Sequence, residues 1–175
     1  MAVARIDWAG RPVDIHHQWL GNPHSDDVWV FLHEGLGSVS MWRDFPAQWC
    51  AALGHRGLMY DRPGYGASTP RAPDERWGVD FLHRQALEVL PALWQSLGLP
   101  AHTRLHLLGH SDGGSIALIA AALQPLPVER TVVLAPHVMV EPISLHSIAL
   151  AREAYVSGDL RRRLAPHHTD PDSAF

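Results

Sequence analysis

The feature that most constrains the fold is an apolar run that ends in Gly-His-Ser-Asp-Gly, within residues 104–118. The run predicts a buried strand, and the small and apolar residues that follow Gly113 predict a helix. A strand that passes directly into a helix through Gly-x-Ser-x-Gly turns sharply and presents the serine at the start of the helix. Ser111 is therefore the candidate nucleophile.

The two glycines of this motif have a steric role. Gly109 and Gly113 stand two residues before and after Ser111, where strand and helix must pass closely around a strained backbone. The free N–H groups and the dipole of the helix start favour negative charge beside the hydroxyl. An ordinary strand-to-helix turn is the alternative, and the strand before and helix after the motif favour the catalytic interpretation.

Further strands and helices alternate along the chain. Continuous apolar runs predict buried strands, and apolar residues at helical spacing, ending near Gly54 and Gly98, predict the helices between them. Residues 5–20 predict a pair of short strands around a turn at Gly10, and Pro91 predicts a kink or break in its helix. Together the elements predict an α/β fold with a mostly parallel sheet and helices on both faces. The predicted buried strands cover residues 28–32, 57–60, 104–108 and 131–135.

Composition narrows the class of protein and its partners. The 175 residues are 46% apolar and 18% charged, which is typical of one ordinary globular chain. The net charge of −4 comes from interspersed charges, and the only basic run, residues 161–163, is typical of a solvated face. We therefore expect no nucleic-acid partner. No apolar run reaches membrane-spanning length and the start lacks a signal-peptide core, which predicts a cytoplasmic protein without a membrane partner.

The single cysteine and the paired histidines do not predict a metal site. Cys50 falls in an apolar helical pattern, so we expect a buried structural thiol. His16 and His17 are adjacent and would face opposite sides of a strand. His106 and His110 share a strand face, but no carboxylate or cysteine spacing completes a ligand set.

Three motifs in order carry a resemblance to a known family. They are Leu-His-Glu-Gly-Leu-Gly-Ser at residues 32–38, Tyr-Asp-Arg-Pro-Gly-Tyr-Gly-Ala-Ser at 60–68, and Gly-His-Ser-Asp-Gly at 109–113. Together they closely resemble the serine hydrolases of the α/β-hydrolase fold. The resemblance implies that residues 1–141 form the N-terminal part of a hydrolase core. It also implies that residues 142–175 form a helical segment that starts a lid.

The resemblance implies an activity and a site. It implies that Ser111 attacks the carbonyl carbon of a small-molecule ester or similar acyl substrate, forming an acyl-enzyme without a cofactor. The oxyanion would be held by the backbone N–H groups of Asp112 and Gly35, with Leu36 as the alternative donor. Glu34 departs from the commoner His-Gly start of that loop.

The loop that contains the second motif has an expected structural role. The resemblance implies that Asp61 and Arg62 anchor it by hydrogen bonds.

The same family places the acid and then the histidine of its triad on loops after later strands. Only one strand is predicted after Ser111, so we expect the remaining strands and the general base to lie beyond Phe175, in a longer hydrolase. A compact variant is the alternative, in which Glu141 orients His167 or His168. A non-catalytic remnant that acts as a binding module is a further alternative.

Two more expectations concern the edge of the sheet. His33 and His137 follow strands at the catalytic edge, so each either lines a pocket or is a satisfied structural histidine. With no later strand beside it, the strand at 131–135 would leave an apolar sheet edge open to self-association. The isolated chain should then be marginally stable or should associate.

Overall fold

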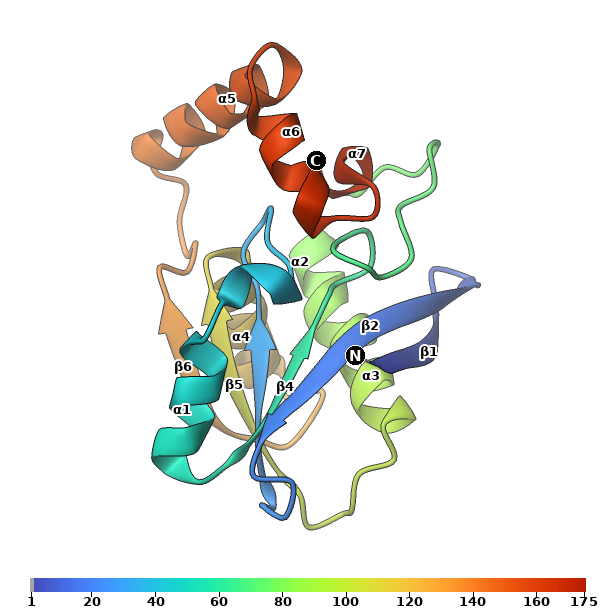
Figure 1. Cartoon of the computed structure of the whole chain (residues 1–175), viewed down its shortest axis with the longest axis vertical. Coiled ribbons are helices and arrows are strands. Elements are labelled where there is room, and N and C mark those ends of the chain that lie inside the picture. The colour runs from blue at the N-terminus through green and yellow to red at the C-terminus, as the bar shows by residue number, and fades with distance from the viewer. Residues whose placement is uncertain (1) are drawn as a thin grey trace.

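The computed structural model describes residues 2–175 and contains a six-stranded sheet in the order β1-β2-β4-β3-β5-β6 (Figure 1). β1 pairs with β2 and β2 with β4 in antiparallel fashion, whereas β4, β3, β5 and β6 run parallel. The predicted α/β class with a mostly parallel sheet is confirmed, and the sheet is open. The strands are β1 (Ala2–Trp8), β2 (Arg11–Gly21), β3 (Asp27–Leu32), β4 (Arg56–Tyr60), β5 (Arg104–His110) and β6 (Val128–Leu134).

The first two strands form the predicted hairpin around Gly10. Its turn has positive φ at Ala9 (52°) and Gly10 (75°), and two such residues match the right-handed twist of the flanking strands. The turn places Ile6 opposite Val13 on the buried side of the pair.

Both faces of the sheet are buried. Strand β3 shows this, because its alternate side chains point to opposite sides of the sheet. Val28, Val30 and Leu32 pack with residues of η2 (Gln85–Val89), α3 (Leu90–Ser96) and α4 (Asp112–Leu123). Trp29 and Phe31 pack on the other face with residues of η1 (Val39–Trp42) and α1 (Phe45–Leu53). The predicted covering of both faces by helices is confirmed.

Helix α1 ends as its sequence predicts. Gly54 follows it in a left-handed conformation (φ 69°), which glycine adopts without steric cost. Cys50 of this helix is fully buried, and burial raises the pKa of its thiol to about 11. The prediction of a buried, structural thiol is confirmed.

The irregularity expected at Pro91 takes the form of a π-helical turn. Helix α2 (Phe81–Arg84) continues into η2, where the N–H of Leu90 donates to the carbonyl of Gln85, five residues back. A proline in an ordinary helix clashes with the carbonyl four residues earlier. The wider turn before Pro91 therefore lets the chain continue as α3.

The C-terminal segment lies beyond the carboxyl ends of the parallel strands (Figure 1). Its tail docks on the loop after β4, since the N–H of Thr169 donates to the Gly66 carbonyl (2.7 Å) and the Ser173 hydroxyl donates to the Gly64 carbonyl (2.8 Å). Within residues 2–175, no helix combines the length and apolar character needed to cross a membrane. The segment comprises α5 (Pro142–Val156), α6 (Leu160–Leu164), η3 (Ala165–His167) and α7 (Pro171–Ala174).

Candidate active site

Ser111 occupies the junction between β5 and α4 with a strained backbone. Its φ of 53° and ψ of −117° are rare for a residue with a side chain. Two hydrogen bonds hold this conformation: the Ser111 N–H donates to the Leu134 carbonyl (2.8 Å), and the Ser115 N–H donates to the Ser111 carbonyl (3.0 Å). The serine is therefore fixed between the end of β6 and the first turn of α4.

The glycines beside Ser111 are sterically required, as the sequence predicts. A Cβ atom on Gly109 would lie 2.1 Å from the carbonyl oxygen of Gly113, and one on Gly113 would lie 1.9 Å from the carbonyl oxygen of Leu32. Both distances are far below van der Waals contact. The start of α4 is thus pressed directly against the ends of β5 and β3.

The predicted oxyanion donors come from two neighbouring segments. Gly35 packs on the side chain of Asp112, since a Cβ on Gly35 would lie 3.1 Å from Asp112 Oδ2. Among the described residues, the N–H groups of Gly35 and Leu36 donate to no other protein group. Asp112 begins α4, whose first N–H groups have no acceptor within the helix. Both segments therefore carry N–H groups that have no acceptor among the described residues.

A buried histidine and arginine hold the loop that carries Gly35. His33 Nε2 accepts the Arg62 N–H (3.1 Å), so the neutral ring donates from Nδ1 to the Glu34 carbonyl (2.8 Å). Burial, with the nearby Arg62 charge, keeps the pKa of His33 well below its usual range. The Arg62 guanidinium is fully buried and also donates to the Glu34 carbonyl (2.8 Å). Of the two expectations for His33, the structural one is confirmed.

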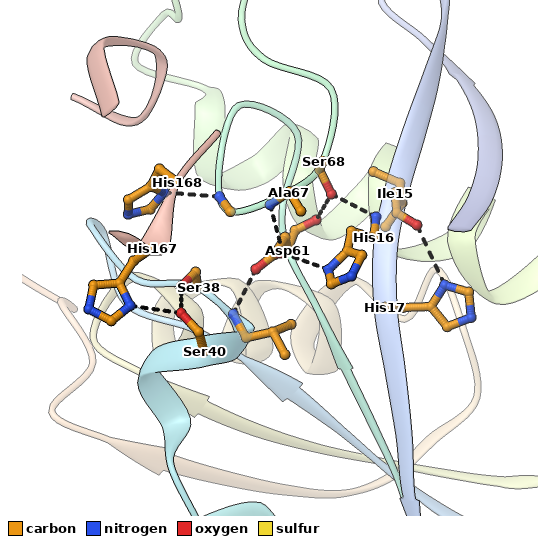
Figure 2. A network of polar contacts seen from close by, with 12 residues as sticks. Ile15, His16, His17, Ser38, Ser40, Asp61, Ala67, Ser68, His167 and His168 are labelled. Atoms are coloured by element: carbon orange, nitrogen blue, oxygen red, sulfur yellow. Dashed lines mark hydrogen bonds and ion pairs between the residues drawn. The ribbon is translucent and has the colours of Figure 1, made fainter. Parts of the chain in front are cut away.

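Asp61 is the centre of a hydrogen-bond network that fixes the loop after β4 (Figure 2). Its carboxylate accepts the N–H groups of Val39 (2.6 Å) and Ala67 (2.9 Å), and Nδ1 of His16 lies 2.9 Å away. The Ser68 hydroxyl donates to the Asp61 carbonyl (2.6 Å). Asp61 and Arg62 thus make the anchoring contacts that the family resemblance implies.

His137 brings an imidazole to the candidate nucleophile. Its Nε2 lies 3.0 Å from Ser111 Oγ. Sequence reasoning identified His137 only as a pocket-lining or structural residue. The signal that could have found it is the parallel pairing of β5 and β6, because neighbouring parallel strands end at the same edge of a sheet.

The triad candidates that the sequence predicted lie elsewhere. His167 Nδ1 is 2.8 Å from the Ser40 hydroxyl, and the two residues line a cavity of about 530 Å³ whose lining does not include Ser111. His168 is buried and contacts backbone groups through both ring nitrogens. Glu141 precedes the first turn of α5. No hydrogen bond within residues 2–175 joins any of these three residues to Ser111, and the compact arrangement of Glu141 with His167 or His168 is not what the structure brings together.

A cluster that sequence reasoning missed joins Asp27 to His55 and His106. His106 Nε2 lies 2.7 Å from one Asp27 oxygen, so the carboxylate absent from the spacing around His106 comes from the adjacent strand β3. His55 accepts the Trp29 indole N–H at Nδ1 (3.0 Å). The neutral ring therefore carries its proton on Nε2, the atom that faces Asp27. The Arg104 guanidinium also binds Asp27 and, as the main cause, lowers the pKa of that carboxyl. Hydrogen bonds and ion pairs account for the ring nitrogens that face Asp27, whereas Nδ1 of His106 is buried without a partner among the described residues.

Comparison with known proteins places the chain in a family. A model described as alpha/beta hydrolase fold matches residues 27–175. The serine hydrolase BPHL of Mus musculus is 33% identical over 134 residues, which are 75% of this chain and 43% of that protein. The sn-1-specific diacylglycerol lipase ABHD11 of Danio rerio is 27% identical over 173 residues, covering 93% of this chain and 51% of that protein. The chain thus spans about half the length, or less, of these curated relatives.

The fold is also that of solved hydrolase structures. A structure from a study of carboxylesterases of Nitrososphaera gargenis superposes with a TM-score of 0.69 at 19% identity, covering 93% of this chain and 56% of that one. At this identity the structural likeness concerns the fold alone. The family assignment comes from the family model, which matches most of the sequence. The chain therefore belongs to the α/β-hydrolase fold family.

Proposed function

We propose that this chain acts as a serine hydrolase on a small-molecule ester or similar acyl bond, with Ser111 as the nucleophile. The observation that carries the proposal is the strained Ser111 backbone at the junction of β5 and α4 (φ 53°, ψ −117°). A protein keeps a strained residue only where the surrounding structure holds it, and such residues gather at functional sites. Here the hydrogen bonds to Leu134 and Ser115 and the glycine contacts supply that support.

The proposed reaction has two stages. The Ser111 oxygen forms a bond to the carbonyl carbon, and the alcohol leaves with a proton to give an acyl-enzyme. Water then attacks the acyl carbon and releases the acid, restoring the Ser111 hydroxyl. The negative oxygen of each tetrahedral intermediate would accept hydrogen bonds from the N–H groups of Asp112 and Gly35, with Leu36 as the alternative to Gly35. Loss of one such donor costs about 3 kcal/mol of transition-state stabilisation.

The names of the relatives support the substrate class. One relative is named a serine hydrolase and another a diacylglycerol lipase. A structural neighbour comes from a study of carboxylesterases. These names favour a carbonyl ester or a related acyl bond for this chain too.

The C-terminal helices fit the role of a lid. We propose that residues 142–175 begin a lid over a core formed by residues 1–141. In support, α5 to α7 add no strand to the sheet and lie beyond the strand ends from which Ser111 emerges (Figure 1). A segment in that place would shape the space above the serine and determine which acyl groups enter.

The test is covalent labelling of the purified chain by a fluorophosphonate probe, with Ser111→Ala as the control. The proposal predicts labelling of the wild-type chain that the substitution abolishes, and a burst of product from a short-chain aryl ester. A folded wild-type chain that is not labelled by the probe would refute the proposed hydrolase activity and favour a binding role for the chain.

The edge of the sheet supports a further proposal, self-association of the chain. β6 is the last strand of the sheet and pairs only with β5 among the described residues. Unpaired strand edges recruit other strands. We propose that a second copy of the chain pairs along β6.

A further inference from the structure

We propose that His137, on the loop between β6 and α5, is the general base that activates Ser111 in this chain. This inference rests on the proposed function, because a base is required only if Ser111 is the nucleophile. Its Nε2 lies 3.0 Å from Ser111 Oγ, which is within the reach that proton transfer needs. The arrangement differs from the one the family resemblance implies, where the histidine follows a later strand.

The main chain of His137 is fixed on the helix that begins at the nucleophile. The His137 N–H donates to the Ser115 hydroxyl (2.9 Å), and that hydroxyl donates to the His137 carbonyl (3.1 Å). Ser115 is itself 5% exposed and lies one turn after Ser111 in α4. The base and the nucleophile are thus held at a set separation by one helical turn.

The loop before His137 adds to this fixation. Ala135 has a positive φ of 47°, which is rare for a residue with a side chain. Pro136 packs on Gly114, where an added Cβ would lie 3.2 Å from the proline Cβ. The Leu134 carbonyl accepts the Ser111 N–H. These contacts turn the chain at the end of β6 so that residue 137 faces the serine.

The proton positions suit a base. A neutral imidazole has one nitrogen that accepts and one that donates. The serine hydroxyl can donate to Nε2, and the ring then carries its own proton on Nδ1. Within residues 2–175, no carboxylate hydrogen-bonds to Nδ1 of His137, and the residue is exposed. The clamp from Ser115 fixes the main chain that carries the ring, whereas the carboxylate of a Ser-His-Asp triad bonds to Nδ1 of the ring itself.

The other histidines near this edge are engaged elsewhere. His33 is buried with both nitrogens hydrogen-bonded. His110 faces Glu34, with 3.6 Å between Nδ1 and the carboxylate. Among the described residues, His137 is the imidazole that hydrogen-bonds to Ser111 Oγ.

The step can be followed with a fluorophosphonate. The Ser111 oxygen forms a bond to phosphorus, the phosphorus–fluorine bond breaks, and fluoride leaves with the electron pair. The proton of the serine hydroxyl passes to Nε2 of His137. With an ester, the same proton then goes from the imidazolium to the departing alkoxide.

The experiment compares labelling rates of four variants of the 175-residue chain: wild type, Ser111→Ala, His137→Gly and His102→Ala. His102 is an exposed histidine before β5 that forms an ion pair with Asp26 (3.2 Å), and it serves as the matched control. Removing a general base lowers rates about 10²- to 10⁴-fold. We expect that loss in His137→Gly and wild-type labelling in His102→Ala. Because the site is exposed, added imidazole should restore part of the rate in His137→Gly, which a merely structural role would not allow.

The outcomes separate the inference from the proposed function. Loss and imidazole rescue in His137→Gly, with no labelling of Ser111→Ala, would support both. If His137→Gly is labelled at the wild-type rate and Ser111→Ala is not labelled, the role of His137 is overturned and the proposed hydrolase function stands. Labelling that survives Ser111→Ala would overturn the proposed function.

Discussion

The His168 ring donates a hydrogen bond from Nε2 to the carbonyl of Leu36 (3.0 Å), which ties the C-terminal segment to the loop of the proposed oxyanion donors. Its Nδ1 accepts the Gly66 N–H (2.9 Å), so one buried imidazole joins the loops after β3 and β4. His168, which the sequence offered as one alternative for the base, therefore links the C-terminal segment to the two loops. The geometry of the proposed oxyanion site depends on it.

Replacing His168 by Ala should destabilise the chain by about 1–3 kcal/mol, because two backbone groups near the ring lose their partners in a buried place. The fluorophosphonate labelling rate should fall as well, since the loop of Gly35 and Leu36 is no longer held. Urea unfolding and labelling measure the two effects. His167→Ala is the matched control: its partner Ser40 is outside the buried core, and the stability change should stay below about 1 kcal/mol. Equal effects of the two variants would contradict the structural role of His168.

Stability should also fall in mild acid. Burial lowers the pKa of His33 and of His168 in the folded chain, while the unfolded chain titrates near the usual value of about 6.5. The unfolded state therefore binds more protons below pH 6.5, so the stabilisation is complete above that pH and is lost as the pH falls. The urea midpoint should be lower at pH 5.5 than at pH 7.5, with a smaller difference in His168→Ala. A midpoint that stays constant or rises in acid would be evidence against this linkage.

The steric role of Gly113 gives a prediction on folding. A Cβ atom on Gly113 would lie 1.9 Å from the carbonyl oxygen of Leu32, so the backbone would have to move to make room for it. Gly113→Ala should cost more than about 3 kcal/mol, at the upper end of single-substitution effects. A Cβ atom on Gly114 would lie 3.2 Å from its nearest neighbours, so Gly114→Ala should lower the stability much less. Thermal unfolding followed by circular dichroism compares the two. A Gly113→Ala chain as stable as Gly114→Ala would contradict the close approach of α4 and β3.

The hydroxyl of Ser115 should matter for activity more than for folding. Ser115→Ala removes both hydrogen bonds that clamp the His137 backbone, and the loop is exposed enough to relax. The labelling rate should fall about tenfold or more, in line with a misplaced catalytic group. Ser115→Thr keeps the hydroxyl and should restore the rate, since the residue borders a cavity of about 340 Å³ that can take a methyl group. Equal loss in both variants would argue for a packing role instead.

The part of the site that could be predicted is local in sequence. Gly109, Ser111 and Gly113 lie within five residues, and the turn they form is determined by their own sterics. The apolar runs likewise predicted the strands and the two covered faces. His137 was not recognised as the partner of Ser111, because that contact depends on β6 lying beside β5. The Asp27–His106 pair was missed for the same reason, since it crosses from β3 to β5.

The role of His168 could not be predicted either. It depends on how a helical tail docks on loops more than 100 residues away in sequence. Periodicity predicts which face of an element is buried, but it does not predict where an exposed segment settles. The boundary between a core at 1–141 and a lid at 142–175 stays a prediction.

The open edge at β6 gives the last prediction, on association. Thr131 lies in the middle of β6 and outside the packed core clusters. A lysine there places a charge on the edge, which is how natural sheets oppose edge-to-edge pairing. Light scattering after size-exclusion chromatography should show wild-type mass rising with concentration, and Thr131→Lys should shift it toward the monomer. Thr103→Lys adds the same charge in the loop before β5 and should associate like the wild type. If Thr131→Lys associates as strongly as Thr103→Lys, the copies meet through another surface, with the exposed apolar residues of α5, such as Ile143 and Ile148, as the next candidate.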